Sequence, residues 1–251
     1  MSRRTFTRWH KTPALGRQIL DRYVLHFEDQ ELYREPGRFP PLDAPHLFAN
    51  AHPLTLEVGC GSAESLCATA ATEPDANFLG VEANVKSLLM AAQGAAAQGL
   101  DNIRFIRANF TLLYPLLVPS SLRAVWLHFP DPHMQPQFRH RRIFGGTFLD
   151  QVHRALVPGG RLSVMTDHEA YFMEMLELAE SDTRFTKTHA ERFLIGSGAA
   201  VPTRFQRQWE SHGLATRRFE LISSPLPAAR ESLAGQDWGS MWVASAHGLQ
   251  T

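Results

Sequence analysis

The feature that most constrains the fold is a regular alternation, from residue 54 onward, of short apolar runs with segments of helical periodicity. The runs that read as strands are residues 54–59, 77–83, 103–109, 122–129 and 160–167. The segments that read as helices are residues 62–72, 85–99, 138–156 and 169–181. Units of this kind build a parallel sheet through right-handed crossovers. The pattern therefore predicts a doubly wound, mostly parallel α/β fold.

The two ends of the chain add to this framework. Residues 216–223 and 240–247 read as a closing antiparallel pair, which would complete a seven-stranded sheet with a C-terminal antiparallel hairpin. Residues 1–50 read as a basic extension, helical over about 12–28 and followed by a proline-rich linker. The expected division is thus an N-terminal extension over 1–50 and one α/β domain over 51–251.

Bulk composition narrows the function. The chain has 251 residues, 44% of them hydrophobic, and a formal net charge of zero, so it can bury a sizeable core but carries no global basic field. Any site for a polyanion must be local. Cys60 and Cys67 suit neither a disulfide framework nor a metal set, and no apolar run approaches the roughly 18 residues of a membrane span. We expect a cytoplasmic protein with no membrane segment and no bound metal.

The first strand-to-helix turn, LEVGCGSAESL, is the first candidate binding element. It places Glu57, Gly59 and Gly61 where a strand ends, and glycine there lets the backbone turn tightly and approach a ligand. Glu64 stands where a dinucleotide fingerprint requires a third glycine, so a pyrophosphate site is disfavoured. Ser62 is the expected N-cap of the helix that follows.

The next two strands each end in a polar residue. Glu82 stands where an acidic side chain can accept hydrogen bonds from both ribose hydroxyls, and Asn109 offers an amide suited to an adenine edge. Each alone could be an ordinary strand end or a turn former. Together with the glycine turn they describe a site for an adenosine without phosphates, such as S-adenosyl-L-methionine.

Two acids follow at the ends of the fourth and fifth strands. Asp131 stands in Phe129-Pro130-Asp131-Pro132, where the prolines bias Phe129 and Asp131 toward extended backbone and restrict the carboxylate. Asp167 ends the fifth strand. Each acid could instead cap the helix after it. The nearby histidines show no metal-ligand spacing.

These residues together resemble a known family. The motifs LEVGCG, GVE, RAN, FPDP followed by HRRI, TD and TRF resemble the tRNA (guanine-N7-)-methyltransferases over residues 54–215. The resemblance implies a class I, Rossmann-like methyltransferase fold, S-adenosyl-L-methionine as donor, S-adenosyl-L-homocysteine as product, and tRNA as partner. Its implied acceptor is N7 of the guanosine at position 46, in the variable loop, where 7-methylguanosine would form.

The resemblance also implies roles for individual residues. Cofactor contacts fall on Glu57, Glu82, Asn109 and Asp131, beside the Gly59 and Gly61 turn, and Asp131 is the implied catalytic acid. Substrate contacts fall on Gln135, Asp167, Thr203, Arg204, Gln206, Arg141 and Arg142. Guanine N7 has a free lone pair, so its methylation needs alignment and charge stabilisation rather than a general base.

The chain departs from the family pattern mainly on the substrate side. His133 replaces a tryptophan, Gln135 replaces a lysine and Gln206 replaces a glutamate, which leaves Arg139, His140, Arg141 and Arg142 as the basic run. Fewer cations should weaken phosphate-driven binding. Two alternatives therefore stay open: a related methyltransferase acting on another nucleobase or a small acceptor, and a cofactor-binding protein without turnover. The oligomeric state, monomer or homodimer, is not predicted.

Overall fold

A mostly parallel sheet runs through the molecule, and the computed structural model describes it within residues 14–196 and 215–225. The order of its nine described strands is β1-β4-β3-β2-β5-β6-β9-β7, with β8 paired to β9. The strands are β1 (Val24–His26), β2 (Leu54–Val58), β3 (Asn77–Glu82), β4 (Ile103–Arg107), β5 (Leu122–His128), β6 (Leu156–Thr166), β7 (Phe185–Lys187), β8 (Leu194–Ile195) and β9 (Arg217–Ser223). The five strands expected from the alternating pattern are all present, so the doubly wound α/β prediction is confirmed.

The chain order reverses direction at β2, which pairs in parallel with β3 on one side and β5 on the other. This is the topological switch point, where open α/β sheets bind ligands at the carboxyl ends of the strands. Six of the seven expected strands, β2 to β6 and β9, lie within the described residues. Three strands that were not expected extend the sheet, because β1 pairs in parallel with β4 and both β7 and β8 pair with β9. The switch point places the ends of β2, β3 and β5 at one edge.

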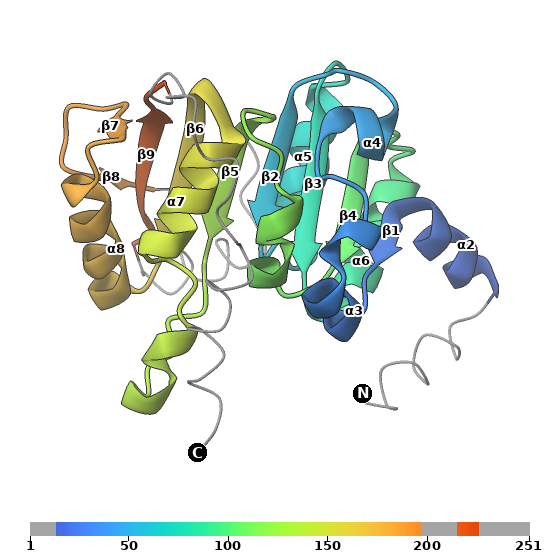
Figure 1. Cartoon of the computed structure of the whole chain (residues 1–251), viewed down its shortest axis with the longest axis horizontal. Helices are drawn as coiled ribbons and strands as arrows, with labels where there is room; N and C mark the ends of the chain where they lie inside the picture. Colours follow the sequence, from blue (N-terminus) through green and yellow to red (C-terminus); the bar gives the residue numbers. More distant parts are fainter. Residues whose placement is uncertain (1–13, 197–214, 226–251) are drawn as a thin grey trace.

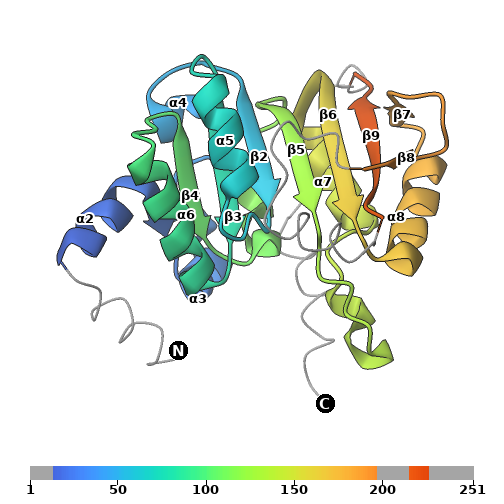
Figure 2. The ribbon, with the colours of Figure 1, turned by 180° about the vertical axis from the view of Figure 1, so that it is seen from behind.

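Helices cover opposite faces of the two halves of the sheet. The α-helices are α2 (Ala14–Tyr23), α3 (Asp29–Arg34), α4 (Ala44–Phe48), α5 (Glu64–Thr72), α6 (Val85–Ala97), α7 (Gly146–Ala155) and α8 (Glu169–Ser181). The 3-10 helices are η1 (Pro36–Arg38), η2 (Phe110–Leu116) and η3 (Pro136–Arg141). In Figure 1, α7 lies in front of β5 and β6, and α8 lies at the β9 end of the sheet, where the Phe172 ring contacts that of Phe219. In Figure 2, α5 and α6 lie in front of β2, β3 and β4. This is the arrangement that right-handed crossovers require.

The burial of each strand depends on which of its faces the helices cover. All of β2 is buried because both of its faces are covered. Its neighbour β5 buries Leu122, Val125 and Leu127 against the α7 layer, but Trp126 and His128 on the opposite face are only partly buried. No described helix lies over that face of β5, which leaves a groove beside α5.

The antiparallel strand expected over 216–223 is present as β9, which is antiparallel to β6, β7 and β8. Its expected hairpin partner, residues 240–247, lies outside the described residues. The two edges of β9 are taken by β6 on one side and by β7 and β8 on the other.

Two helix predictions were wrong. The single helix over 138–156 is instead η3 and α7, separated by a break at residues 142–145. Gly145 is extended and Gly146 begins α7, and adjacent glycines oppose a continuous helix. The helix over about 12–28 ends at Tyr23, because the next three residues join the sheet as β1. The stop of α6 near Gly99 is confirmed, since Gly99 has a φ of 63°.

The stretch expected as a linker packs onto the sheet layer. The amide of Leu42 donates to the carbonyl of Leu116 at 2.8 Å, and both Leu32 and Leu42 belong to the main hydrophobic core. The division at residue 50 stays a prediction, but residues before it contribute both a strand and core side chains.

Candidate active site

Backbone hydrogen bonds join the glycine turn after β2 to the neighbouring strand β3. The amides of Gly59 and Cys60 donate to the carbonyl of Val81 at 2.8 and 3.1 Å. Gly59 and Gly61 have φ values of 74° and 55°, in the left-handed region that favours glycine. A Cβ atom built at either position would meet nothing within 4 Å. The turn therefore needs glycine for its conformation and leaves open space above it.

The helix after the turn begins differently from the expectation. Its N-cap is Ala63, at φ 54°, and no side chain accepts a hydrogen bond from the first turn. The prediction of Ser62 as the cap was wrong, because the left-handed residue is one position later. The first amides of α5 thus lack a side-chain cap.

Glu82 ties the end of β3 to this turn. Its Oε2 accepts a hydrogen bond from the amide of Gly61 at 3.1 Å, and its Oε1 accepts one from the amide of Asn84 at 2.7 Å. Each carboxylate oxygen can accept a further hydrogen bond. Glu82 can therefore shape the glycine turn and still accept from two ribose hydroxyls.

Asn109 has its side-chain oxygen occupied locally. It caps η2 by accepting from the amide and the hydroxyl of Thr111, at 3.2 and 3.1 Å. The turn-forming alternative is therefore realised. Its amide NH2 group has no hydrogen-bond partner among the described residues, so it remains a donor at the carboxyl edge.

Glu57 is a buried carboxylate at the same edge. Its side chain is 6% exposed, and its Oε1 lies 3.6 Å from Nδ1 of His128 on β5. The sequence singled out Glu57 but gave His128 no role. The available signal was its position on β5, one alternation beyond Trp126 and on the same face.

Asp131 leaves the end of β5 on a strained loop. Its side chain is 71% exposed, and its Oδ1 accepts from the amide of His133 at 2.9 Å. Asp131 does not cap the next helix, because η3 begins at Pro136 with Gln135 at the N-cap. The cap alternative is thereby excluded.

The expectation of extended backbone at Phe129 was wrong. Phe129 has a φ of 52° and His133 a φ of 39°. The amide of Phe129 still donates to the carbonyl of Met165 at 2.7 Å, so the chain must leave the sheet abruptly after that bond. Left-handed backbone at a non-glycine residue costs on the order of 1–2 kcal/mol. Strain on both sides of Asp131 is typical of a functional loop.

Asp167 follows β6, which pairs in parallel with β5 as far as His128 and Met165. The two acids therefore leave neighbouring strands at one edge of the sheet. Asp167 does not cap α8, because His168 does so by accepting from the amide of Tyr171 through Nδ1 at 3.1 Å. The Oδ1 of Asp167 is 3.5 Å from the hydroxyl of Thr166.

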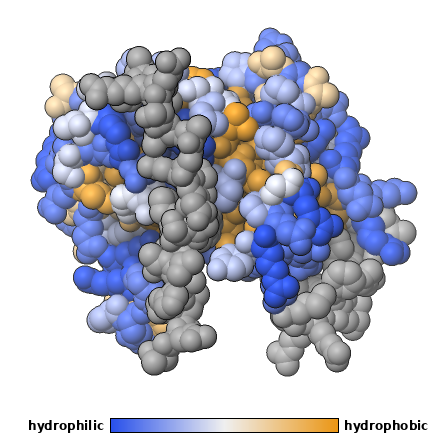
Figure 3. All heavy atoms as spheres, viewed as in Figure 1, coloured by the Kyte–Doolittle hydropathy of each residue, from blue (hydrophilic) through white to orange (hydrophobic). Residues whose placement is uncertain are grey.

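The segment after Asp131 projects away from the sheet, as Figures 1 and 2 show for η3. The region where η3 lies is mostly hydrophilic in Figure 3. Gln135 and Arg141 are exposed there, and the guanidinium of Arg141 lies 4.6 Å from the ring centroid of Phe138. Both side chains are available to a partner.

Arg142 differs from its neighbour, and its expected place among substrate contacts does not fit its surroundings. Its side chain is 9% exposed and pairs with Glu174. Its Nε donates to the carbonyl of Pro132 at 2.7 Å, and the guanidinium lies over the ring of Tyr171. Arg142 therefore fastens the Asp131 loop to α8. Three other residues expected to contact the substrate, Thr203, Arg204 and Gln206, lie outside the described residues.

The thiols of Cys60 and Cys67, near the glycine turn, have raised pKa values. Burial raises the pKa of the Cys67 thiol to about 12, and burial with the nearby Glu57 carboxylate raises the pKa of Cys60. Neither is a nucleophile at neutral pH. Within the described part of the chain, no group of three or more His, Cys, Asp or Glu side chains is placed to hold a metal ion. No described helix is long and apolar enough to cross a membrane.

Comparison with known proteins agrees with this geometry. A family model described as "Putative methyltransferase" matches residues 51–218. A tRNA (guanine-N(7)-)-methyltransferase of Rubrobacter xylanophilus is 47% identical over 222 residues, which cover 88% of this chain and 99% of that protein. The same enzyme of Chloroherpeton thalassium is 34% identical, covering 82% of this chain and 91% of that protein.

Among solved structures, a 16S rRNA (adenine(1408)-N(1))-methyltransferase from Catenulisporales acidiphilia matches with a TM-score of 0.50 and 12% identity, covering 80% of this chain and 94% of that chain. At this identity the likeness concerns the fold, which is that of a class I methyltransferase. The fold, the glycine turn with its acids, and the two sequence relatives converge on one assignment: the chain belongs to the tRNA (guanine-N7)-methyltransferase family.

Proposed function

We propose that the protein transfers a methyl group from S-adenosyl-L-methionine to N7 of guanine in tRNA, at the guanosine of position 46 in the variable loop. The observation that carries the proposal is the placement of Asp131 and Asp167 at the ends of adjacent parallel strands, beside the Gly59–Gly61 turn. The printed names of the sequence relatives support the same reaction.

The residues at this edge fit the methyl donor. The cofactor supplies a methyl group on a positively charged sulfonium. The glycine turn leaves open space for it, Glu82 can accept from its ribose hydroxyls, and the amide NH2 of Asn109 can donate to its adenine. The buried carboxylate of Glu57 can balance its positive charge, since a buried charge requires a partner.

The two acids suit guanine as the acceptor. A carboxylate that accepts from guanine N1–H and N2–H orients the ring and offsets the positive charge that N7 methylation creates. Adenine lacks this donor pair, so it would leave the carboxylate unpaired, at a cost of about 1–3 kcal/mol. The exposed Asp131 can select guanine and stabilise the product without removing a proton.

The projecting η3 segment suits tRNA phosphates. Arg139 and Arg141 are exposed on it, and phosphate contacts by such cations position a nucleic acid without reading its sequence. The variable loop can present an unstacked base at modest cost. The two described cysteines, Cys60 and Cys67, are free thiols, which suits a reducing compartment, so we propose a cytoplasmic location.

The test is transfer of a labelled methyl group from the cofactor to tRNA that lacks 7-methylguanosine, followed by nucleoside analysis. We expect one labelled product, 7-methylguanosine, and its loss when guanosine 46 is replaced. Asp131→Ala should lower the rate at least about 100-fold, which is the scale for losing one electrostatic contact to the transition state. Asp75→Ala, at an exposed turn, is the matched control and should keep full activity.

Two results would overturn the proposal. Labelled product that forms equally after ribonuclease treatment would indicate a small acceptor. Cofactor binding with no labelled product from any tRNA would indicate a binding protein without turnover.

A further inference from the structure

A buried polar pair lies between the cofactor edge and the strand that carries Asp131. Glu57 on β2 lies opposite Trp126 on β5 in the parallel register, so His128 follows on the same face. The side chains of Glu57 and His128 are 6% and 11% exposed, and Glu57 Oε1 lies 3.6 Å from His128 Nδ1. That separation is just longer than a hydrogen bond.

Both side chains have unmet hydrogen-bonding capacity. Glu57 Oε2 and His128 Nδ1 are buried and have no hydrogen-bond partner among the described residues. Buried polar atoms without partners are costly and uncommon, and those that persist require an explanation. Here the two atoms belong to side chains that face each other at the cofactor edge.

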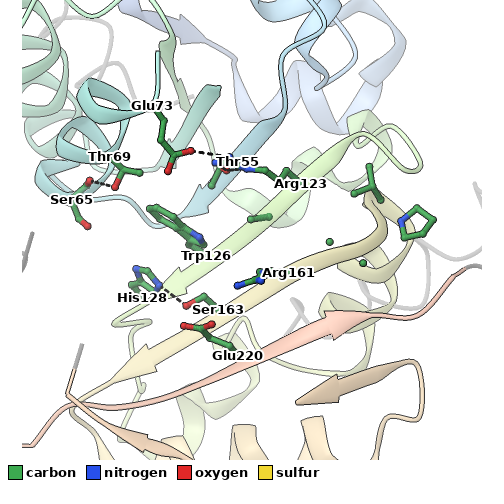
Figure 4. A pocket seen from close by; sticks show the side chains of 15 residues that line it. Thr55, Ser65, Thr69, Glu73, Arg123, Trp126, His128, Arg161, Ser163 and Glu220 are labelled. Atoms are coloured by element: carbon green, nitrogen blue, oxygen red, sulfur yellow. Dashed lines mark hydrogen bonds and ion pairs between the residues drawn. The ribbon is translucent and has the colours of Figure 1, made fainter. Parts of the chain in front are cut away.

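His128 is held firmly from its other side. Its Nε2 lies 3.1 Å from the hydroxyl of Ser163 on β6, and its ring stacks on Trp126 with centroids 5.5 Å apart. Figure 4 shows His128 directed at Ser163, with Trp126 beside it, along the wall of a groove of about 530 Å³. If the Ser163 hydroxyl donates to Nε2, the ring proton lies on Nδ1 and faces Glu57.

We propose that His128 is a positioning residue that sets the Glu57 carboxylate for the methyl donor. The inference rests on the proposed function. Ser163 and Trp126 fix the imidazole, its Nδ1–H directs Oε1 of Glu57, and Oε2 is left to meet the positive charge of the cofactor. Hydrogen bonds of this kind are often long without ligand and shorten in the complex.

This arrangement assigns β5 two tasks. Only two residues separate His128 from Asp131. The strand that leads to the Asp131 carboxylate, proposed to contact guanine, therefore also carries the side chain that orients the Glu57 carboxylate for the cofactor. One strand thereby fixes the methyl donor and the acceptor relative to each other, as alignment of reacting groups requires.

Binding of S-adenosyl-L-homocysteine to the full chain, measured by calorimetry, tests the role of His128 without requiring turnover. His128→Phe keeps a ring against Trp126 but removes both nitrogens, and we expect about tenfold weaker binding. His128→Asn can place its NH2 group near the position of Nδ1, and we expect binding within about threefold of wild type. His153→Phe replaces a buried histidine outside the site and should leave the affinity unchanged.

A double-mutant cycle with Glu57→Gln separates positioning from a general structural role. If His128 acts through Glu57, His128→Phe should change affinity by less than about twofold in the Glu57→Gln background. An equal loss in both backgrounds, wild-type affinity for His128→Phe, or equal weakening by Phe and Asn would overturn the inference. Failure of the proposed function would appear instead as absent methyl transfer with these affinities intact.

Discussion

The proposed site has two halves with different structures: a cofactor half around Glu57 and Glu82, and a substrate half around Asp131. On the cofactor side, Glu57 is buried, and Glu82 holds the amide of Gly61 through a hydrogen bond of 3.1 Å. On the substrate side, Asp131 is 71% exposed and stands between two residues with left-handed backbone, Phe129 and His133. The cofactor half is shaped by neighbouring strands, whereas the substrate half is a strained loop fastened to α8 through one buried arginine. The difference leads us to expect that Arg142 acts by holding the Asp131 loop in place and not by contacting phosphate.

After the loss expected for Asp131→Ala, the largest expected effect is at Arg142, whose removal would free the Asp131 loop. Arg142→Met should lower kcat on the order of 10- to 100-fold, because small misplacements of a reacting group cost this much. The dissociation constant for tRNA should change by less than about threefold, since Arg142 is not at the phosphate surface. Steady-state kinetics and filter binding measure the two quantities.

Arg141→Met is the matched control for that experiment. It should weaken tRNA binding and leave kcat at saturating tRNA nearly unchanged, because Arg141 is exposed. The reverse result, with Arg142→Met affecting only binding, would assign the phosphate contact to Arg142 and remove the contrast between the two halves.

Next in size is the effect of Glu82, which tests how far the cofactor half is preformed. Glu82→Ala leaves the amides of Gly61 and Asn84 without their acceptors, so the free energy of unfolding should fall by about 1–3 kcal/mol. Binding of S-adenosyl-L-homocysteine should weaken by more than about tenfold. Denaturant unfolding and calorimetry measure these changes. An unchanged free energy of unfolding for Glu82→Ala would mean that the glycine turn keeps its conformation without the Glu82 carboxylate.

A smaller effect is expected in the salt dependence of tRNA binding. Each phosphate contact contributes a slope of about 0.7–0.9 to the plot of log affinity against log salt. Arg141→Gln should reduce the slope by about one contact, and Gln135→Lys should add about one. Titrations at several salt concentrations measure both. An unchanged slope in both variants would place the phosphate surface elsewhere.

The last prediction is that Cys60 and Cys67 do not react with a thiol reagent in the native protein. Their raised pKa values keep the thiols neutral at pH 8, with that of Cys67 at about 12. A thiol reagent should therefore modify the native protein only as fast as it unfolds. Gln137→Cys, on the exposed substrate half, should react at once. Rapid modification of wild-type protein would show that the cofactor half opens readily.

Most of the framework was predictable because its causes are local. The apolar runs fixed β2 through β6, and helix α8 begins and ends at the predicted residues 169 and 181. The polar residues expected at the cofactor edge do lie at or near strand ends, since Glu57 is in β2, Glu82 ends β3 and Asn109 follows β4. Their contacts with the cofactor stay a prediction. The predictions for Thr203, Arg204 and Gln206 stay untested.

The errors arose where distant contacts decide the outcome. Residues 24–26 became a strand because β4 offers them an edge. Phe129 left the extended region because its amide bonds to the carbonyl of Met165 before the chain turns away. His168 replaced Asp167 as the cap of α8 through its ring nitrogen. Patterns of propensity do not contain these contacts.

Arg141 and Arg142 separate what the sequence predicts from what only the tertiary structure decides. The sequence by itself determined where most strands lie along the chain and which polar residues stand at their ends, because periodicity and turn residues act over a few positions. It gave two adjacent arginines the same expected role. The tertiary structure alone decided that one is exposed beside Phe138 and the other is buried against Glu174 and Pro132, since burial depends on which distant elements pack around a side chain.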